Sequence, residues 1–258
     1  MDRVIEIAVV GSDARLYYCT EHLRAKGIKA VQFSDNAIPS GVRYYLFAPP
    51  APFRKLSDVS FAKNGATVFA GAVDEDSETL ITSQGGIVID YCKTDRYAYE
   101  NSALTAEAAI MVYVGASSTS LRGAKTLVSG FGRIGKALSA LLKAHGADVT
   151  ASARKLQDIE LIRAYGCKPM ETAAIRGEYD VVFNTIPANV YTRDIIDRTK
   201  TDYYVELASA PFGIESRGIW GNGTKVILAS GLPGKVLPVS AGKLIADTVC
   251  TIMEEARI

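Results

Sequence analysis

The stretch TLVSGFGRIGKALSALLKAHGADVTASAR, residues 126–154, decides the fold of the chain. It opens with a short β-rich run, and the pattern G-x-G-x-x-G follows at Gly130, Gly132 and Gly135. Apolar residues at helical spacing continue to His145, and a second β-rich run ends at Ala153. A strand, a glycine turn, a helix and a second strand in this order predict a βαβ unit that binds the pyrophosphate of a nicotinamide dinucleotide.

Each glycine of the pattern has a physical task in such a unit. Gly130 permits the tight turn, Gly132 lets the backbone approach the phosphates, and Gly135 lets the helix pack closely on the strand. The helix is expected from Ile134 to His145, and Arg133 and Ile134 lie at its N-terminus, where free N–H groups and the positive end of the helix dipole favour an anion. The competing interpretation is a tight turn without a ligand.

The end of the second strand indicates which dinucleotide is bound. Sites that prefer NAD place Asp or Glu about 20 residues after the glycine turn, where the carboxylate accepts a hydrogen bond from the ribose 2′-OH. This chain instead has Ser152, Arg154 and Lys155, which suit a 2′-phosphate. The sequence therefore predicts NADP, with NAD less favoured. Alternatively, Arg154 and Lys155 bind no phosphate and are only solvated residues at the start of the next helix.

Later strand ends are expected to surround the same site, because the carboxyl ends of parallel strands meet at one edge of a sheet. The candidate cofactor-binding residues at these ends are Asn184, Thr185, Ile186, Pro187, Leu207, Ala208, Gly231, Leu232 and Pro233.

The alternation of strand and helix patterns along the chain predicts an α/β fold with two Rossmann-like, doubly wound parallel-sheet domains. A connecting helix and a C-terminal helix are expected to cross between them. We expect an N-terminal substrate-side domain at 1–96, an interdomain helix and hinge at 97–120, and the dinucleotide domain at 121–236. The final helix, at 237–258, is expected to pack back on the first domain.

Composition excludes several classes of function. The net charge is +1, with 29 basic and 28 acidic residues, so no overall field attracts nucleic acid or an anionic membrane. The most apolar helical stretch, 103–116, is too short to span a bilayer. The N-terminus, with Asp2 and Arg3, lacks the pattern of a signal peptide, and four widely spaced cysteines suggest neither disulfides nor zinc. We expect a cytoplasmic protein with a small-molecule ligand and no metal.

The two histidines, His22 and His145, both lie at positions that suit a structural role. This argues against a 2-hydroxy-acid dehydrogenase that uses a histidine as its proton shuttle. A site that binds a hydride acceptor but has no obvious strong base fits an oxidation whose product is intrinsically stable, such as the formation of an aromatic ring.

The chain also resembles the dipicolinate synthase A-chain family of spore-forming bacteria over nearly its whole length. The matching stretches are Ile7 to Arg15, Asn101-Ser102 with Thr105 to Glu107, Gly130 to Gly135, Gly146 to Thr150 leading to Ala153-Arg154, Asn184 to Pro187, Leu207 to Ser209, and Gly231 to Gly234 running to Ala241-Gly242. The resemblance implies oxidation of dihydrodipicolinate to dipicolinate with NADP during sporulation, in partnership with a flavoprotein-like B subunit. It leaves the oligomeric state open, a homo-oligomer included.

A planar dicarboxylate substrate would need fixed hydrogen-bond donors. The candidate substrate-binding residues are Arg15, Asn101, Ser102, Thr105 and Ser209. Asp13 or Glu107 is the candidate catalytic proton acceptor, although Asp13 also suits a helix cap and Glu107 a solvated helix position. Two other functions stay open: an NADP-dependent reductase of shikimate dehydrogenase type, and a non-catalytic nucleotide-binding subunit.

Overall fold

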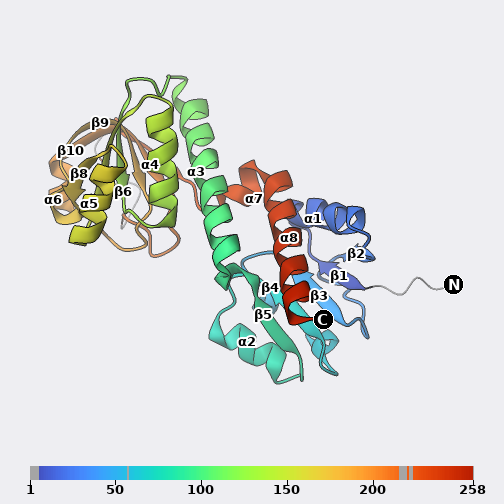
Figure 1. Ribbon diagram of the computed structural model, residues 1–258. Coiled ribbons are helices and arrows are strands. Elements are labelled where there is room, and N and C mark those ends of the chain that lie inside the picture. Colours follow the sequence, from blue (N-terminus) through green and yellow to red (C-terminus); the bar gives the residue numbers. More distant parts are fainter. Residues whose placement is uncertain (1–5, 57, 215–219, 221–222, 258) are drawn as a thin grey trace. The chain divides into compact units, whose positions relative to one another are not determined.

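The computed structural model describes residues 6–56, 58–214, 220 and 223–257. The chain forms two compact units (Figure 1). Unit 1 comprises Met1–Asn101 with Pro233–Ile258, and unit 2 comprises Ser102–Leu232. Each contains one parallel sheet with flanking helices, so the predicted fold class is confirmed. The expectation about Asp2 and Arg3 lies outside the described residues.

Unit 1 contains a five-stranded sheet in the order β2-β1-β3-β4-β5, with all pairs parallel. Its strands are β1 (Ile7–Val10), β2 (Ala30–Phe33), β3 (Tyr44–Phe47), β4 (Thr67–Ala70) and β5 (Ile87–Asp90). Every residue of β1, β3 and β4 is buried, as expected for central strands of a parallel sheet that is covered on both faces. The order reverses between β1 and β3, which is therefore the switch point of this sheet.

The helices of unit 1 come from both parts of the chain. They are α1 (Ala14–Ala25), α2 (Glu75–Thr82), the beginning of α3 (Asp95–Ser117) and α8 (Pro238–Ala256), with 3-10 turns at Phe53–Lys55, Ser60–Ala62 and Tyr91–Lys93. The last helix, α8, packs along α1 (Figure 1). Gly242 permits this approach, because a Cβ there would lie 2.4 Å from the carbonyl oxygen of Arg15. None of the described helices is long and apolar enough to cross a bilayer.

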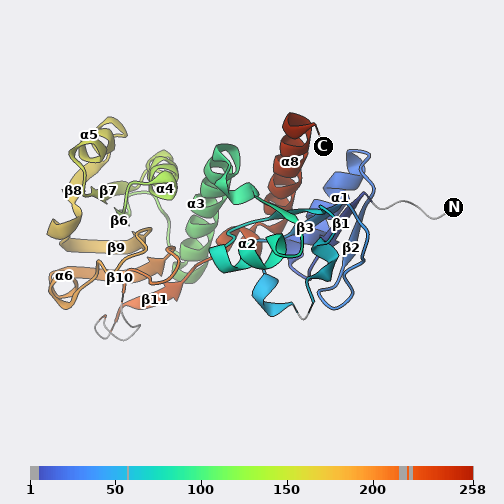
Figure 2. The same cartoon turned by 90° about the horizontal axis from the view of Figure 1, so that it is seen from below.

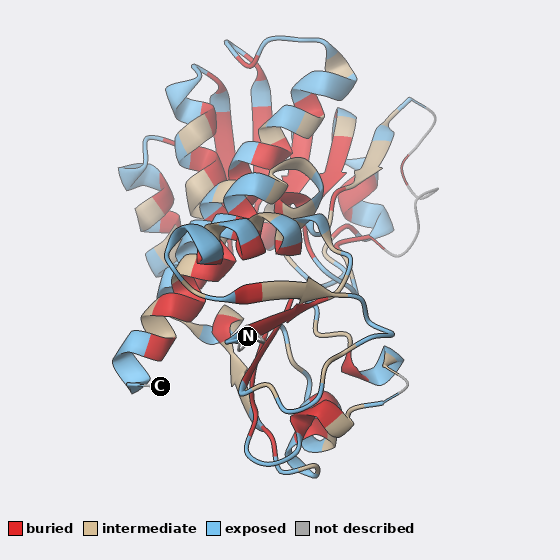
Figure 3. Cartoon of the chain, turned by 90° about the vertical axis from the view of Figure 1, so that its right-hand side faces the viewer, coloured by how far each residue is buried: buried red, intermediate tan, exposed pale blue. Residues whose placement is uncertain are grey.

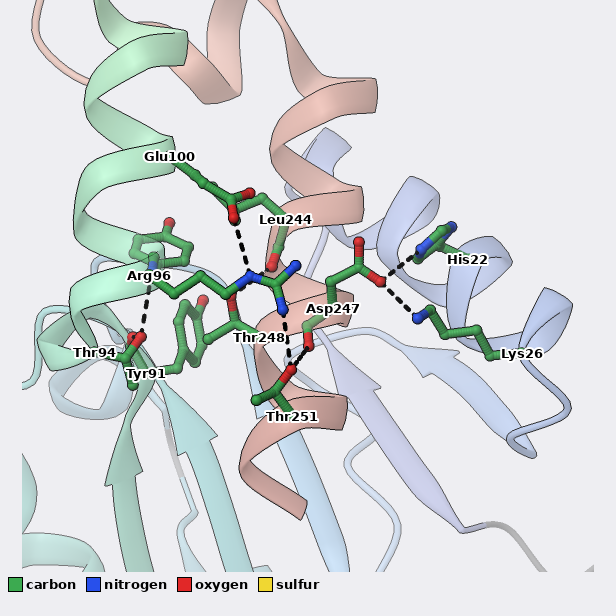
Figure 4. Close-up of polar contacts among 11 residues, drawn as sticks. His22, Lys26, Tyr91, Thr94, Arg96, Glu100, Leu244, Asp247, Thr248 and Thr251 are labelled. Carbon is green, nitrogen blue, oxygen red and sulfur yellow. Dashed lines mark hydrogen bonds and ion pairs between the residues drawn. The ribbon is translucent and has the colours of Figure 1, made fainter. Parts of the chain in front are cut away.

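Polar contacts also hold α8 in place (Figure 4). The Asp247 Oδ1 atom lies 2.9 Å from His22 Nε2 and 2.7 Å from Lys26 Nζ, both of which belong to or follow α1. On the α3 side, Arg96 donates to Glu100 and to the Thr251 hydroxyl of α8. The C-terminal helix is thus fixed to unit 1 by charge as well as by apolar packing.

Replacing Asp247 with asparagine should lower the free energy of unfolding by about 1 kcal/mol at neutral pH, as is typical of partly exposed ion pairs. Burial alone would raise the pKa of the Asp247 carboxyl, but the contacts with Lys26 and His22 outweigh it and lower this pKa. A lowered folded-state pKa adds stability above the unfolded-state value, and that stability disappears as the pH falls through the folded-state value. Urea unfolding of both proteins at several pH values should show that the difference between their free energies of unfolding disappears below about pH 4. A gap independent of pH would contradict the assignment.

Unit 2 contains a six-stranded parallel sheet in the order β11-β10-β9-β6-β7-β8, which can be followed across Figure 2. The strands are β6 (Lys125–Ser129), β7 (Asp148–Ala153), β8 (Lys168–Glu171), β9 (Gly177–Asn184), β10 (Thr199–Glu206) and β11 (Lys225–Leu228). The helices are α4 (Arg133–Ala144), α5 (Leu156–Ala164), α6 (Arg193–Asp197) and the rest of α3, with a 3-10 turn at Thr172–Ala174; α7 (Leu232–Val236) begins at the boundary of the unit. Read from β8, this is the 3-2-1-4-5-6 order of dinucleotide-binding sheets.

The buried residues of each unit follow its strands and the inward faces of its helices (Figure 3). In unit 2 one cluster joins Leu127, Val182 and Tyr204 from three neighbouring strands with Tyr191 and Trp220. This packing fixes the carboxyl ends of β6, β9 and β10, from which the candidate site is built.

Candidate functional site

The switch point of the unit 2 sheet lies between β6 and β9, where the strand order reverses. The loops that follow these two strands are in direct contact. The Thr185 Oγ1 atom donates to the carbonyl oxygen of Ser129 at 2.8 Å, and its backbone N–H donates to the same oxygen at 2.9 Å. The predicted residues Thr185 and Ile186 therefore stand beside the glycine turn, with Pro187 exposed just beyond them.

The glycine turn has the geometry that its pattern predicts. Gly130 has φ = +95°, and a Cβ there would lie 2.5 Å from Thr185 Oγ1. A Cβ at Gly135 would lie 2.0 Å from the carbonyl oxygen of Gly130, so only glycine lets α4 come this close to the turn. A Cβ at Gly132 would meet no heavy atom within 4 Å. Two glycines are thus needed for packing, whereas Gly132 faces open space.

The start of α4 is suited to an anion. Gly132 is its N-cap, no side chain caps the helix, and its first turn contains no acidic residue. Within the described residues, neither the N-cap side chain nor a first-turn carboxylate therefore compensates the first N–H groups and the positive dipole end of this 12-residue helix. Arg133 is exposed and Ile134 is half-buried at this end.

At the end of β7, Arg154 and Lys155 are both exposed. Within the part of the chain that the structure describes, neither cation forms an ion pair. Asp148 lies at the opposite, amino end of β7, where it pairs with Lys168 at 2.6 Å. The carboxyl end of β7 thus offers two exposed positive charges.

The predicted residue Ser152 differs from these two cations. Its side chain is completely buried, and its hydroxyl has no hydrogen-bond partner. A 2′-phosphate on the present surface would therefore meet Arg154 and Lys155 rather than the Ser152 hydroxyl.

Asn184 and Glu206 form a buried polar pair at neighbouring strand ends. They are opposite each other in the β9–β10 register, and both are 0% exposed. Asn184 Nδ2 donates to Glu206 Oε1 at 2.7 Å and to the carbonyl oxygen of Ile186 at 3.0 Å, while Asn184 Oδ1 accepts from the Ile186 N–H at 3.2 Å. The pair therefore shapes the loop after β9 that reaches the glycine turn.

The sequence pattern places Glu206 at one of the strand ends expected around the site but assigns it no binding role. A signal was present, since a glutamate ends the otherwise apolar and aromatic run Tyr203-Tyr-Val-Glu206 and is followed by small residues. Leu207 and Ala208 after it are buried, and Ser209 is exposed. The predicted cofactor-binding residues 231–233 are divided between the two units. Gly231, with φ = +68°, and Leu232 belong to unit 2, whereas Pro233 belongs to unit 1.

The substrate-side candidates of unit 1 lie at the switch point of its own sheet. Arg15 donates from Nε and Nη2 to the two carboxylate oxygens of Asp13, both at 2.8 Å, and from Nη2 to the carbonyl oxygen of Pro49 at 2.6 Å. Asp13 also caps α1 by accepting from the Arg15 N–H. The side-chain hydrogen bond from Arg15 lowers the pKa of the Asp13 carboxyl, which makes it a weaker base.

The remaining candidates lie along α3. Asn101 belongs to unit 1, and Ser102, Thr105 and Glu107 belong to unit 2. Ser102 and Thr105 are buried, whereas Glu107 is exposed. The structure thus brings together Asp13 with Arg15 in one unit, and the glycine turn with the loop after β9 in the other.

Other features of the described residues lie away from the glycine turn. A hollow of about 660 Å³ lies at the amino ends of β9 and β10, lined by Glu178, Lys200 and Trp220 among others. His145 follows the far end of α4, where Nδ1 lies 2.8 Å from the carbonyl oxygen of Leu141. No group of three or more metal-ligating side chains is present in the described ranges.

Residues 96–203 match the family of the NAD binding domain of D-isomer specific 2-hydroxyacid dehydrogenases. Among curated proteins, the dipicolinate synthase A chain of Bacillus subtilis (strain 168) is 27% identical over 192 residues, or 73% of this chain. The match spans 65% of the length of that relative, slightly less than two thirds.

Two solved structures extend the likeness to the whole fold. The dipicolinate synthase A chain from Bacillus halodurans gives a TM-score of 0.84 at 24% identity, covering 98% of this chain and 99% of that chain. The corresponding structure from Bacillus subtilis gives 0.82 at 23% identity, covering 100% and 98%. The resemblance inferred from the sequence is confirmed. The matched region is thus similar to the NAD binding domain of dehydrogenases, and the chain as a whole is similar to the A chain of dipicolinate synthase.

Proposed function

We propose that the protein is the A chain of a dipicolinate synthase and oxidises dihydrodipicolinate to dipicolinate with NADP during sporulation. The observation that carries this proposal is the 27% identity to the A chain of dipicolinate synthase over 192 residues. The site supports it independently, because an oxidation of this kind needs an acceptor for a hydride and an anion-binding turn that holds the acceptor.

The residues around the glycine turn fit the diphosphate of a dinucleotide. The open space at Gly132 and the uncapped start of α4 leave room and hydrogen-bond donors for an anion. We assign the diphosphate to the main chain from Gly130 to Gly135, including Arg133 and Ile134. The loops of Asn184–Pro187, Leu207–Ala208 and Gly231–Pro233 are assigned to the rest of the cofactor. When bound, the nicotinamide supplies the acceptor for the hydride.

NADP is favoured over NAD by the charge at the end of β7. A carboxylate there would repel a 2′-phosphate, but the strand ends in the exposed pair Arg154 and Lys155. Asp148 is at the other end of the strand and pairs with Lys168, so it is not a candidate to bind the ribose 2′-OH.

On the substrate side, Arg15 is the strongest candidate to bind a carboxylate of a dicarboxylate. Its Nε and Nη2 atoms are held by Asp13 and by the carbonyl oxygen of Pro49, and this orients the guanidinium. Asn101, Ser102, Thr105 and Ser209 remain candidates for further polar contacts with the substrate.

The reaction removes two hydrogen atoms from the dihydropyridine ring. One leaves as a hydride with its electron pair, and the other leaves as a proton, which yields the aromatic ring. Of the two candidate proton acceptors, Glu107 is preferred, because Arg15 lowers the pKa of Asp13. The aromaticity of the product reduces the need for a strong base.

The same proposal includes a partner, a flavoprotein-like B subunit, since the relatives are named as one component of a synthase. We also propose a cytoplasmic location. The four cysteines are free, which fits a reducing compartment.

The proposal is tested with the purified protein, by itself and with its partner, supplied with dihydrodipicolinate and NADP⁺. We expect dipicolinate absorbance to appear together with NADPH, and Arg15→Gln to raise KM about ten-fold or more through the loss of a charged hydrogen bond. Turnover of dehydroshikimate alone would support the shikimate-type reductase instead. NADP binding without turnover of either substrate, even with the partner, would indicate a non-catalytic nucleotide-binding subunit.

A further inference from the structure

Glu206, the last residue of β10, is a carboxylate with no exposed surface. It accepts four hydrogen bonds, two on each oxygen. Oε1 accepts from Asn184 Nδ2 at 2.7 Å and from the Ala208 N–H at 3.2 Å. Oε2 accepts from the Tyr204 hydroxyl at 2.7 Å and from the Gly213 N–H at 2.8 Å. Every lone-pair direction of the group is thus used by a neutral donor.

This set of donors suits an ionised carboxylate. A carboxylate only accepts hydrogen bonds, whereas a carboxylic acid must also donate one. Two of the four partners are backbone N–H groups, which cannot accept, and the Asn184 amide is oriented by its second bond to the Ile186 carbonyl oxygen. In the described residues, no Lys or Arg forms a hydrogen bond or an ion pair with Glu206. Its negative charge is solvated by dipoles but is not neutralised by a cation.

The topology relates this anion to one half of a bound dinucleotide. In a 3-2-1-4-5-6 sheet the two halves of the cofactor lie on either side of the switch point, at the carboxyl ends of the strands. The adenosine half belongs with β6 and β7, where Arg154 and Lys155 are found. The nicotinamide half belongs with β9, β10 and β11, and Glu206 ends β10 opposite Asn184, where the loops that begin at Thr185 and Leu207 start.

We propose that Glu206 makes the site prefer the oxidised cofactor. The nicotinamide ring carries a positive charge in NADP⁺ and none in NADPH, so a fixed buried anion nearby stabilises the oxidised form selectively. This inference rests on the proposed function, since it requires a bound nicotinamide dinucleotide. It adds a binding preference to that function: the site holds NADP⁺ more tightly than it would without the anion and releases NADPH more readily.

The test measures the dissociation constants of NADP⁺ and NADPH for the purified wild-type chain and for Glu206→Gln, by calorimetry and by NADPH fluorescence. Wild type is expected to bind NADP⁺ at least as tightly as NADPH. In Glu206→Gln the ratio of the two affinities should move towards NADPH on the order of ten-fold, the effect of one charge across several ångströms in a partly polar medium. Affinity for 2′-phospho-ADP-ribose, which lacks the nicotinamide, should stay unchanged.

Tyr191→Phe is the matched control, because it removes the buried hydrogen bond between Tyr191 and Ser129 without changing any charge. It should leave the NADP⁺ to NADPH ratio unchanged. An equal loss of affinity for all three ligands in Glu206→Gln would show a purely structural role and overturn the inference. If that variant does not fold, a ten-fold preference of wild type for NADPH would also overturn it. A wild-type chain that binds neither NADP⁺ nor NADPH would instead refute the proposed function.

Discussion

Replacing Gly135 with alanine should abolish measurable dinucleotide binding and lower the free energy of unfolding by about 3 kcal/mol, at the upper end of ordinary overpacking. The added Cβ would lie 2.0 Å from the carbonyl oxygen and 2.9 Å from the carbonyl carbon of Gly130. Both are backbone atoms of the turn, so the contact is relieved only if α4 moves away from β6. Urea unfolding and titration with NADP⁺ measure the two effects separately.

Gly132→Ala is the control, because its Cβ would meet nothing within 4 Å and its φ of −76° is open to alanine. Its unfolding free energy should stay within about 0.5 kcal/mol of wild type, as at surface positions. Its affinity for NADP⁺ should still fall, since the methyl group would occupy the space assigned to the diphosphate. Unchanged NADP⁺ binding by Gly132→Ala would exclude the glycine turn as the phosphate site.

Removing both cations at the end of β7, as Arg154→Ala with Lys155→Ala, should weaken NADP⁺ binding about 100-fold and leave NAD⁺ binding nearly unchanged. Two hydrogen bonds to a charged group are worth about 3 kcal/mol together, and only NADP carries the 2′-phosphate that accepts them. Both side chains are exposed, so the substitutions should not affect folding. Parallel titrations with NADP⁺ and NAD⁺ give the ratio directly.

Lys168→Ala is the comparison for this pair, since Lys168 is also a cation of this sheet but pairs with Asp148 at the amino end of β7. It should change neither affinity. Equal wild-type affinity for NADP⁺ and NAD⁺, unaffected by the double substitution, would refute the choice of NADP.

The features that the sequence predicts best are those set by local steric requirements. The three glycines of the turn, the helix after them and the basic end of β7 are all visible in residues 126–154, because backbone conformation and close packing restrict the residue types there. The strand patterns of unit 1 are equally clear, since β1, β3 and β4 are wholly buried.

Elements with little buried surface were not predicted. Helix α2 carries three acidic residues in its first turn and buries only Ser77 and Ile81, so its apolar periodicity is weak. Strand β8 is at the edge of its sheet and reads Lys-Pro-Met-Glu, with a proline that is tolerated only at such an edge. Helix α2 and strand β8 form because they pack against or pair with the neighbouring sheet, and their own sequences carry little signal.

The polar contacts of the site depend on residues that are distant in sequence. Arg15 is held by the Pro49 carbonyl oxygen, 34 positions away, and Glu206 is paired with Asn184, 22 positions away. The burial of Ser152 likewise follows from its neighbours on both sides of β7. Such pairings appear only when the strand order is known, which a single sequence does not provide.

The packing of α8 on α1 has a consequence for how the protein is made. During translation, unit 2 is complete once Leu232 has left the ribosome, whereas unit 1 still lacks residues 233–258. The face of α1 that α8 covers, around the backbone of Arg15 and Cys19, stays uncovered until those residues emerge. Unit 1 should therefore close after unit 2, even though the strands of unit 1 are synthesised before those of unit 2.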